Sequence, residues 1–439
     1  MKILLLRMKI TDKVPMPEAP LGLLYIASVL ENAGHEVIYR DLTFDEISNE
    51  EWKMIERGEF ELIGITMLSF LRNQAYDLIK KVKSLNTGVK IIVGGVHASA
   101  TSLQLVDNFP IDAVILGEGE LTVLDIVECM QNKGNWRKIR GIATKEGRVH
   151  EPQPLIQNLD SIPFPAFHLT DIARYKMSIA SLKPDKTVNG IRIGDANWVG
   201  MIASRGCVGR CIFCNAFDHW GLKVRFRSPE NMLNEIEWLQ YEFGVSLIAF
   251  NDDAFPILKR QCMEFCNGIV KRGIKIAWQT TTRPNVLDQE MCQAMRESGC
   301  FMVVIGCESG SQKILDRIKK FIKVEDSVRT IRMISENRMW SYALLMIGNP
   351  GESDGTIEET IQFLQISKPD IVSFVSGVMI TPGTEMEQLG VQAKLLKPNF
   401  WVQGADGLPF YTAEASYDKI LGWSNKVSKA YPNNFDRLK

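Results

Sequence analysis

Short apolar runs alternate with amphipathic segments over the first third of the chain. The apolar runs predict buried strands, expected at Lys2–Leu6, His35–Asp41, Glu61–Leu68, Val89–Val96 and Ala113–Leu116. The amphipathic segments predict helices, expected at Leu21–Ala33, Asn73–Leu85 and Thr122–Asn132. Gly34 stands where a C′ glycine ends the first helix, and Gly141–Val149 has the pattern of a small hairpin. Strands that alternate with helices favour an α/β fold with a doubly wound parallel sheet.

The same alternation returns after Glu151–His168, where four prolines indicate a semi-rigid extended linker. Six further strands are expected at Trp198–Ala203, Ser246–Phe250, Lys275–Gln279, Phe301–Gly306, Ser341–Ile347 and Ile371–Met379. The helices between them are expected at Pro229–Phe243, Leu258–Arg272, Asp288–Ser298, Val324–Asn337 and Ile357–Ile366. Gly244, Gly273 and Gly299 follow three of these helices as C′ residues. Six strand–helix pairs are too few for a closed eight-stranded barrel.

Composition narrows the class of protein. The chain has 439 residues, 45% of them hydrophobic, and a net charge of −1. This charge creates no field that would attract nucleic acid or an anionic membrane surface. The apolar start MKILLLRMKI is too short for a signal peptide, and the longest apolar run, Leu21–Leu30, is too short to span a bilayer. We therefore expect a cytoplasmic protein without nucleic-acid or membrane partners.

Three of the nine cysteines lie together in SRGCVGRCIFCN, Ser204–Asn215, with C-x3-C-x2-C spacing. A structural zinc ion usually takes four protein ligands, and no further cysteine pair completes such a set. Three thiolates suit a [4Fe–4S] cluster with one open iron, which can hold a small chelating ligand. Gly206 and Gly209 favour an irregular loop over three cysteines buried on a helix.

This stretch closely resembles the cluster motif of the radical S-adenosylmethionine (SAM) enzymes, including Phe213 before the last cysteine. The resemblance implies a [4Fe–4S] cluster on Cys207, Cys211 and Cys214, with SAM chelating the open iron. An electron from the cluster then cleaves SAM to a 5′-deoxyadenosyl radical. It also implies a (βα)6 partial TIM barrel, with reactive groups at the carboxyl ends of the strands.

The later strand ends resemble the SAM-binding positions of this family. A carboxylate of Asn251-Asp252-Asp253 would accept from the methionyl amino group, and the Arg283 guanidinium would hold the methionyl carboxylate. Glu308 resembles the residue that accepts the ribose hydroxyls. The full set expected to bind SAM is Phe213, Asn251, Asp252, Asp253, Arg283, Glu308, Ser309, Ile347 and Gly348.

The first strand is not followed by G-x-G-x-x-G, so a dinucleotide is not favoured. Instead Pro20–Val37, Val93–Ser99 and Gly117–Thr122 resemble the cobalamin-binding domain that precedes the barrel in many radical SAM enzymes. The D-x-H-x-x-G motif is absent, so cobalamin is expected to bind without a histidine ligand, although His97 stands at a strand end and could face it. The contacts expected are Thr66, Gly94, Gly95, His97, Gly117, Glu118, Gly119 and Glu120. A Rossmann-like domain without cofactor stays an alternative.

Each of the remaining cysteine, aromatic and polar candidates has a structural and a functional interpretation. Cys262, Cys266 and Cys292 suit core packing better than an auxiliary cluster, and Cys307 is expected to face the helices if Glu308 faces the barrel lumen. The first domain holds only Cys129, so it lacks the second cluster of methylthiotransferases. Candidates for substrate contact or for scaffold are Asn215, Asp218, His219, Trp220 and Trp278.

These observations predict four parts: a cobalamin-binding-like Rossmann domain (1–150), a linker (151–197), a radical SAM partial barrel (198–390) and a C-terminal tail (391–439) with one helix, Tyr417–Tyr431. The tail or another subunit is expected to cover the substrate mouth.

The resemblance implies a cobalamin-dependent methyltransferase for an unactivated carbon, in which one SAM methylates cob(I)alamin and a second supplies the radical. Its partners would be a small-molecule metabolite and a reductant such as flavodoxin or ferredoxin. The alternatives are a radical SAM dehydratase or rearrangement enzyme with a vestigial cobalamin domain, and a non-enzymatic Fe–S or corrinoid carrier.

Overall fold

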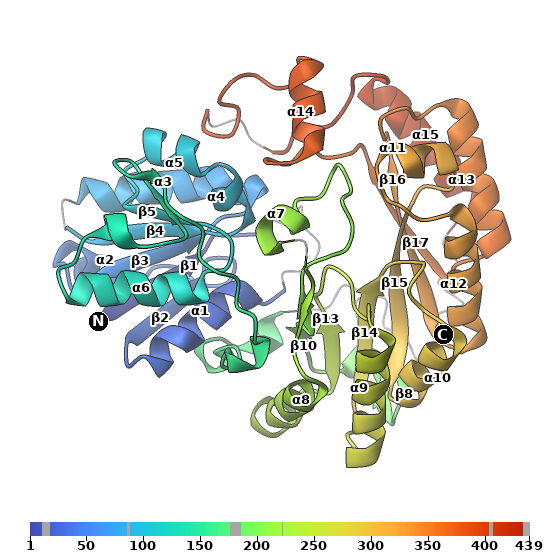
Figure 1. The fold of residues 1–439 in the computed structure, drawn as a ribbon, viewed down its shortest axis with the longest axis horizontal. Coiled ribbons are helices and arrows are strands. Elements are labelled where there is room, and N and C mark those ends of the chain that lie inside the picture. The colour runs from blue at the N-terminus through green and yellow to red at the C-terminus, as the bar shows by residue number, and fades with distance from the viewer. Residues whose placement is uncertain (11–17, 86–87, 176–185, 222, 404–406, 433–439) are drawn as a thin grey trace.

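The computed structural model describes residues 1–10, 18–85, 88–175, 186–221, 223–403 and 407–432. They form two sheets side by side, with the short helix α7 (Ala216–Trp220) lying between them (Figure 1). Among the described residues, no helix has both the length and the apolar character needed to cross a membrane. The fold is α/β in both halves, as the sequence predicts.

The first sheet has seven strands in the order β2-β1-β3-β4-β5-β6-β7. The strands are β1 (Lys2–Arg7), β2 (Glu36–Asp41), β3 (Leu62–Thr66), β4 (Lys90–Gly94), β5 (Ala113–Ile115), β6 (Ile142–Thr144) and β7 (Arg148–Val149). The first five are parallel, and β6 and β7 add the expected antiparallel hairpin. The helices are α1 (Leu21–Asn32), α2 (Asn49–Glu56), α3 (Arg72–Ser84), α4 (Val96–Ala100), α5 (Ser102–Asn108) and α6 (Glu120–Gln131).

Helices cover both faces of this sheet because successive side chains of a strand point to opposite faces. Ile3 and Leu5 of β1 pack into one hydrophobic core with α1 and α6, whereas Leu4 and Leu6 pack into a second core with α3 and α5. The prediction of a doubly wound sheet is therefore confirmed. In such sheets the carboxyl ends of the strands form the binding edge.

The second sheet has six parallel strands in the order β10-β13-β14-β15-β16-β17. They are β10 (Trp198–Met201), β13 (Leu247–Phe250), β14 (Ala277–Thr282), β15 (Cys300–Glu308), β16 (Trp340–Ile347) and β17 (Ile371–Ser376). The helices are α8 (Pro229–Phe243), α9 (Lys259–Arg272), α10 (Gln289–Glu297), α11 (Gln312–Arg317), α12 (Val324–Glu336), α13 (Asp354–Ser367), α14 (Glu385–Gln392) and α15 (Tyr417–Ala430). This is the predicted partial barrel, open between its two edge strands, β10 and β17.

Local signals in the sequence fix most helix ends of this half. Ser228 caps α8 by accepting from the Asn231 N–H, Pro229 occupies the first turn, and Gly244 closes the helix with a positive φ. Some strand boundaries differ from the prediction: β17 ends at Ser376 instead of Met379, and β14 runs on to Thr282 instead of ending at Gln279. The threonines after Gln279 are β-branched and suit a strand, so Arg283 is the first residue past the strand end.

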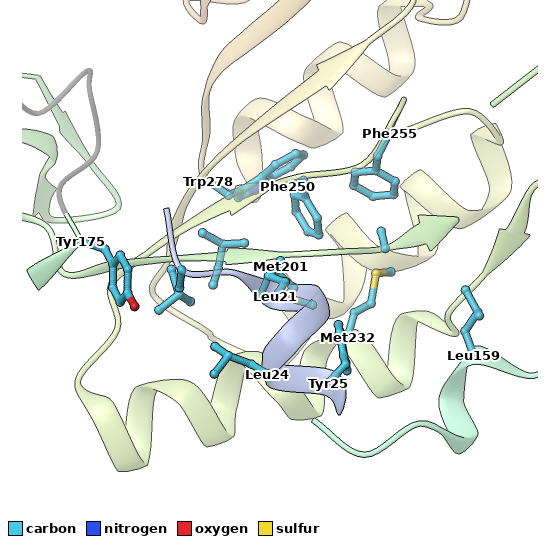
Figure 2. Close-up of a cluster of buried hydrophobic side chains, with 14 of the residues drawn as sticks. Leu21, Leu24, Tyr25, Leu159, Tyr175, Met201, Met232, Phe250, Phe255 and Trp278 are labelled. Atoms are coloured by element: carbon cyan, nitrogen blue, oxygen red, sulfur yellow. The ribbon is translucent and has the colours of Figure 1, made fainter. Parts of the chain in front are cut away.

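A single hydrophobic core joins the two halves. Leu24 and Tyr25 of α1 lie in one cluster with Met201 of β10, Met232 of α8 and Phe250 of β13 (Figure 2). The linker packs along the same cluster, where the Ala166 N–H donates to the Leu24 carbonyl at 3.2 Å. Part of the segment expected between Tyr175 and Trp198, residues 176–185, lies outside the described residues. The continuous core holds the two sheets in a fixed mutual position.

The C-terminal segment returns to the first half after the last strand. The Trp401 carbonyl accepts from the Tyr76 hydroxyl at 2.7 Å, and the Gly407 carbonyl accepts from Arg72 at 2.9 Å. The chain then forms α15, the closing helix predicted by the sequence, whose Trp423 indole N–H donates to Asp354 at 2.6 Å. Helix α14 lies above the gap between the two sheets (Figure 1). The tail therefore bridges both halves on the side of the strand ends.

Candidate functional site

The three motif cysteines lie on one loop that follows β10. A two-stranded ladder closes the base of this loop, formed by β11 (Ser204–Arg205) and β12 (Arg225–Phe226). Gly206 starts the loop with φ +105°, a conformation that L side chains rarely adopt. Gly209 lies against Arg283, since a Cβ there would lie 2.6 Å from Nη1 and would displace the guanidinium. The sequence correctly predicted an irregular, glycine-dependent loop.

The thiols of this loop are free and partly enclosed. The Gly209 N–H donates to Sγ of Cys207 and the Ala216 N–H donates to Sγ of Cys214, both at 3.4 Å. Burial raises the pKa of Cys211, and it raises that of Cys214 to about 11. Among the described residues, no three His, Cys, Asp or Glu side chains converge closely enough to hold a single metal ion. The thiolates of a cluster bind different irons and so have no need to converge on one point.

Two cations lie beside Cys211. Arg283 hydrogen-bonds the thiol, and the positive charges of Arg283 and Lys320 both oppose the effect of burial on its pKa. Arg283 also donates to the Lys320 carbonyl. Lys320 is buried, and its Nζ donates to Oε1 of Glu308 at 2.7 Å. Sequence reasoning missed Lys320, since nothing in the run Lys319-Lys320 distinguishes an inward lysine from an exposed one.

The three polar residues after β13 point in different directions. Asn251 donates to Glu18 at 2.8 Å, and Asp252 accepts from the Ser204 hydroxyl at 2.5 Å and from the Ala203 N–H at 2.9 Å. Burial raises the pKa of Asp252 to about 7. Asp253 accepts from the Gly206 N–H, and its charge acts on Cys214. Asp253 therefore lies closest to the cysteine loop, whereas Asp252 fixes the backbone before it.

The remaining residues expected to bind SAM are placed as follows. Ser309 faces α13, because its hydroxyl lies 3.4 Å from that of Thr360. The Gly348 N–H donates to Oε2 of Glu352 at 2.6 Å, and the Ile347 carbonyl accepts from the Gly377 N–H at 2.8 Å. Main-chain groups of both residues, which are expected to contact SAM, thus have partners within the chain. Phe213 packs against the hydrophobic cluster around α11.

A cavity of about 360 Å³ lies between the carboxyl ends of the two sheets. From the first half it is lined by residues of the strand ends, among them Thr66, Gly94, Gly95, Gly117, Glu118, Gly119 and Glu120. From the second half it is lined by residues beside the cysteine loop, among them Ser204, Arg205, His219, Trp220, Asn251 and Asp253. Most of the other lining side chains are aliphatic. Seven of the eight residues expected to contact cobalamin therefore share one wall.

His97 is the exception. Its side chain is fully buried, and its ring nitrogens lie 3.1 Å from the Tyr76 hydroxyl and 3.0 Å from the Ser69 hydroxyl. Burial lowers the pKa of this imidazole to about 3. The residue lies in the first turn of helix α4, which turns the side chain into the core behind the sheet. The expectation that His97 could face the ligand is therefore wrong, because its ring hydrogen-bonds Tyr76 and Ser69 instead.

The other cysteines and Trp278 belong to the scaffold. Cys262, Cys266 and Cys292 are buried in the main core. Cys307 is fully buried beside Ser327 of α12 and so faces the helices, as predicted. Trp278 is 1% exposed and packs edge-on against Phe265 of α9, so it is not a substrate contact. Of the candidates after Cys214, His219 and Trp220 line the cavity, and the side chain of Asp218 lies outside the described residues.

Comparison with known proteins gives two matches along the chain. Residues 201–364 match the model of the radical SAM superfamily, and residues 8–127 match that of the B12 binding domain. An uncharacterized methyltransferase of Pyrococcus horikoshii is 31% identical over 391 residues, which cover 87% of this chain and 80% of that protein. The chain belongs to the radical SAM superfamily, in the group with an N-terminal B12-binding domain. This confirms the family predicted from the cysteine motif.

Two further proteins resemble this radical SAM chain over most of its length. The cytidylyl-2-hydroxyethylphosphonate methyltransferase of Streptomyces wedmorensis is 29% identical over 82% of this chain and 75% of its own. The structure of TsrM from Kitasatospora setae, a radical SAM methyltransferase with cobalamin and a [4Fe–4S] cluster bound, has a TM-score of 0.75 at 18% identity. It covers 98% of this chain and 89% of that one. At that identity the likeness establishes the shared fold.

The residues of this radical SAM enzyme fit the cofactors of its two domains, a [4Fe–4S] cluster, SAM and cobalamin. Sγ of Cys207 and Sγ of Cys214 each accept a backbone N–H group, and the Arg283 guanidinium occupies the space beside Gly209. In the B12-binding domain Gly95 has φ +97°, and a Cβ there would lie 3.1 Å from the Met67 carbonyl oxygen. Glycine at this position therefore lets the turn after β4 pack closely against the end of β3, where the cavity begins.

Proposed function

We propose that the chain is a cobalamin-dependent methyltransferase that acts on an unactivated carbon of a small molecule. The observation that carries the proposal is the shared cavity, whose walls are the glycine turns of the B12-binding domain and the helix that follows Cys214. When bound, the cluster and SAM supply a 5′-deoxyadenosyl radical, and the corrinoid supplies the methyl group. The methyltransferase names of similar proteins support this outcome.

The charged side chains around the cysteine loop are complementary to the methionyl amino and carboxylate groups of SAM. Arg283 and Lys320 are the cations beside Cys211, so they are proposed to hold the methionyl carboxylate. Asp253, at the other side of the loop, is proposed to accept from the methionyl amino group. Glu308 is proposed to accept the ribose hydroxyls, with Lys320 orienting its carboxylate. Each of these side chains is oriented by a contact within the chain before any ligand arrives.

The apolar part of the cavity has a separate role. Aliphatic side chains such as Leu5, Ile65 and Ile92 line it, and they exclude water from the space between the two domains. A closed site of this kind prevents side reactions of a reactive intermediate. The substrate is proposed to be a small molecule that enters beside His219 and Trp220, and a protein such as flavodoxin or ferredoxin is proposed to supply the electrons.

Product analysis tests methyl transfer against the other radical outcomes. Anaerobic protein with a reconstituted cluster is incubated with hydroxocobalamin, SAM and a titanium or dithionite reductant. We expect both S-adenosylhomocysteine and 5′-deoxyadenosine, the first because SAM has lost its methyl group and the second because SAM has been cleaved. Formation of 5′-deoxyadenosine with no S-adenosylhomocysteine, whether or not cobalamin is added, would favour a dehydratase or rearrangement enzyme with a vestigial B12-binding domain.

A further inference from the structure

The base of the cysteine loop is attached to the B12-binding domain by buried ion pairs. Arg205 of β11 donates to Glu118 at 2.8 Å and to Glu120 at 2.5 Å. Arg225 of β12 donates to both carboxylate oxygens of Glu118 at 2.8 Å. The two glutamates belong to the Gly-Glu-Gly-Glu turn after β5. These four side chains, here called the interdomain clamp, join the two ends of the cysteine loop to the other sheet.

The interdomain clamp is closed to water and internally neutral. The exposed fractions of its four side chains lie between 2% and 6%. The Ile156 N–H donates to Glu118 as well, and Arg225 also donates to the Ile156 carbonyl at 2.8 Å. Burial opposes ionisation of Glu118, but the hydrogen bonds and charge of Arg205 outweigh it and hold its pKa below the usual value. Each charge of the interdomain clamp has an opposite partner, although Nε of Arg205 and Nε of Arg225 have no hydrogen-bond partner among the described residues. Separating such a buried pair leaves an uncompensated charge, so the arrangement tolerates little displacement.

The interdomain clamp also touches the cavity. Glu118, Glu120 and Arg205 are all lining residues, and the Arg205 guanidinium lies 5.3 Å from the ring centre of Trp220, another lining residue. Trp220 ends α7, which starts two residues after Cys214. The carbonyl of His219 in the same helix lies 3.4 Å from the position of a Cβ on Gly117. Cavity wall, interdomain clamp and cysteine loop are thus one connected unit.

We propose that the interdomain clamp makes the B12-binding domain a structural part of the iron–sulfur site. Glu118, Glu120, Arg205 and Arg225 are positioning residues: they hold both ends of the cysteine loop, so the loop keeps its cluster only while anchored to the turn after β5. A corrinoid bound in the cavity packs against α7 and strengthens the attachment of the cysteine loop to the B12-binding domain. The anchoring of the loop needs only a cluster on the loop, whereas the effect of the corrinoid rests on the proposed function.

Release of iron tests the interdomain clamp without measuring activity. Reconstituted, reduced protein is mixed anaerobically with a ferrous chelator, and the rate of iron transfer is followed by absorbance. Glu118→Gln should raise this rate about ten-fold, which corresponds to about 1.4 kcal/mol in the stability of the loop–cluster unit. Glu235→Gln is the matched control: Glu235 is fully buried and pairs with Arg227, two residues beyond Arg225, but within the barrel. Its rate should stay within about two-fold of the unaltered chain.

Hydrogen exchange supplies the second readout. In the cluster-free protein, amides of residues 206–221 should exchange faster in Glu118→Gln than in Glu235→Gln. If Glu118→Gln does not yield folded protein, Arg225→Lys keeps the charge but loses the paired geometry and should give an intermediate rate. Unchanged iron release and unchanged exchange in folded variants would overturn the proposal.

Hydroxocobalamin separates this proposal from the proposed function. It should slow iron release from the unaltered chain and have a smaller effect on Glu118→Gln. If Glu118→Gln releases iron quickly but hydroxocobalamin changes neither rate, the anchoring role stands and the corrinoid part of both proposals fails.

Discussion

At the scale of single residues, the pair of Glu308 and Lys320 is held in an unusual backbone. Glu308, Lys319 and Phe321 all have positive φ values, between 54° and 63°, although none is glycine. Such conformations cost of order 1–3 kcal/mol each and persist only where the surrounding structure imposes them. Burial disfavours the charged lysine, yet the charge of Glu308 raises the pKa of Lys320 above its usual value. The strained segment therefore presents a preformed ion pair beside Cys211.

Replacement of Glu308 tests the proposed ribose contact. Glu308→Gln keeps the shape but loses the charge, so SAM affinity should fall about ten-fold, because hydrogen bonds to a charged group contribute roughly 1.5–3 kcal/mol each. Glu308→Ala should cost more. Glu325→Gln, on the exposed first turn of α12, is the control and should leave affinity unchanged. Equilibrium dialysis on cluster-replete protein measures this, and full SAM affinity in Glu308→Ala would place the ribose partner elsewhere.

The buried carboxyl of Asp252 predicts a pH dependence of stability. Its pKa is raised to about 7 by burial, so between the usual aspartate range and neutrality the folded chain binds more protons than the unfolded chain. The free energy of unfolding then falls as pH rises through this window. Glu352, with its pKa also raised to about 7 by burial, acts in the same direction. Ionisation of Asp252 near neutral pH thus destabilises the folded chain at the end of β13, where this carboxyl accepts from the Ser204 hydroxyl.

Asp252→Asn should therefore flatten the pH profile of the cluster-free protein. The decrease in Tm between about pH 5 and about pH 8 should shrink but not vanish, since burial also raises the pKa of Glu18, Glu235, Asp253 and Glu352. Asp418→Asn, at an exposed position on α15, should leave the profile unchanged. Thermal melts by circular dichroism give the profiles. A profile for Asp252→Asn that matches the unaltered chain would contradict the raised pKa.

At the scale of elements, the turn after β15 is fixed by close contact with helix α13. A Cβ on Gly310 would lie 2.6 Å from Cα of Thr360 and 3.0 Å from the Glu359 carbonyl oxygen. These are backbone atoms of a packed helix, so they cannot move aside cheaply. The Thr360 hydroxyl also accepts from the Gly310 N–H at 3.1 Å. The contact between Gly310 and α13 therefore fixes the turn that follows Glu308, the last residue of β15.

Gly310→Ala should destabilise the chain by about 1–3 kcal/mol through overpacking, as measured by urea unfolding. Gly355→Ala is the matched control, because that glycine lies in the first turn of α13 with only Ser353 Oγ, at 3.8 Å, within reach of a Cβ. Alanine is the better helix former, so this control should be neutral or slightly stabilising. Equal effects of the two substitutions would mean that the turn is free to move away from α13.

The sequence predicts those elements whose signals are local. Five strands of the first sheet, six of the second and the helices with an N-cap and a C′ glycine, such as α8, follow from periodicity and capping. The short helices α4 and α5 were not predicted, because five and seven residues give too little periodicity. Lys320 and the burial of His97 depend on which distant segments meet, and no local pattern encodes that. The cysteine loop was predictable because its ligands are consecutive in the chain.

At the scale of the whole molecule, the two sheets behave as one body. Their cores merge through α1, β10 and α8 (Figure 2). The buried interdomain clamp joins the turn after β5 to the cysteine loop. The carboxyl ends of both sheets consequently face one cavity. A cofactor bound at the glycine turns lies beside the loop that carries the cluster, and this juxtaposition is the basis of the proposed methyl transfer.

The most direct test of the account is the joint content of iron and corrinoid in one chain. The protein is reconstituted anaerobically with iron, sulfide and hydroxocobalamin, desalted, and assayed for both metals and for its visible spectrum. We predict about four irons and one corrinoid per chain. Replacing Cys207, Cys211 and Cys214 by alanine should remove the iron and leave the corrinoid, whereas replacing the core residues Cys262 and Cys266 should leave both. Loss of all corrinoid on desalting, or a full complement of iron in the triple variant, would contradict the account.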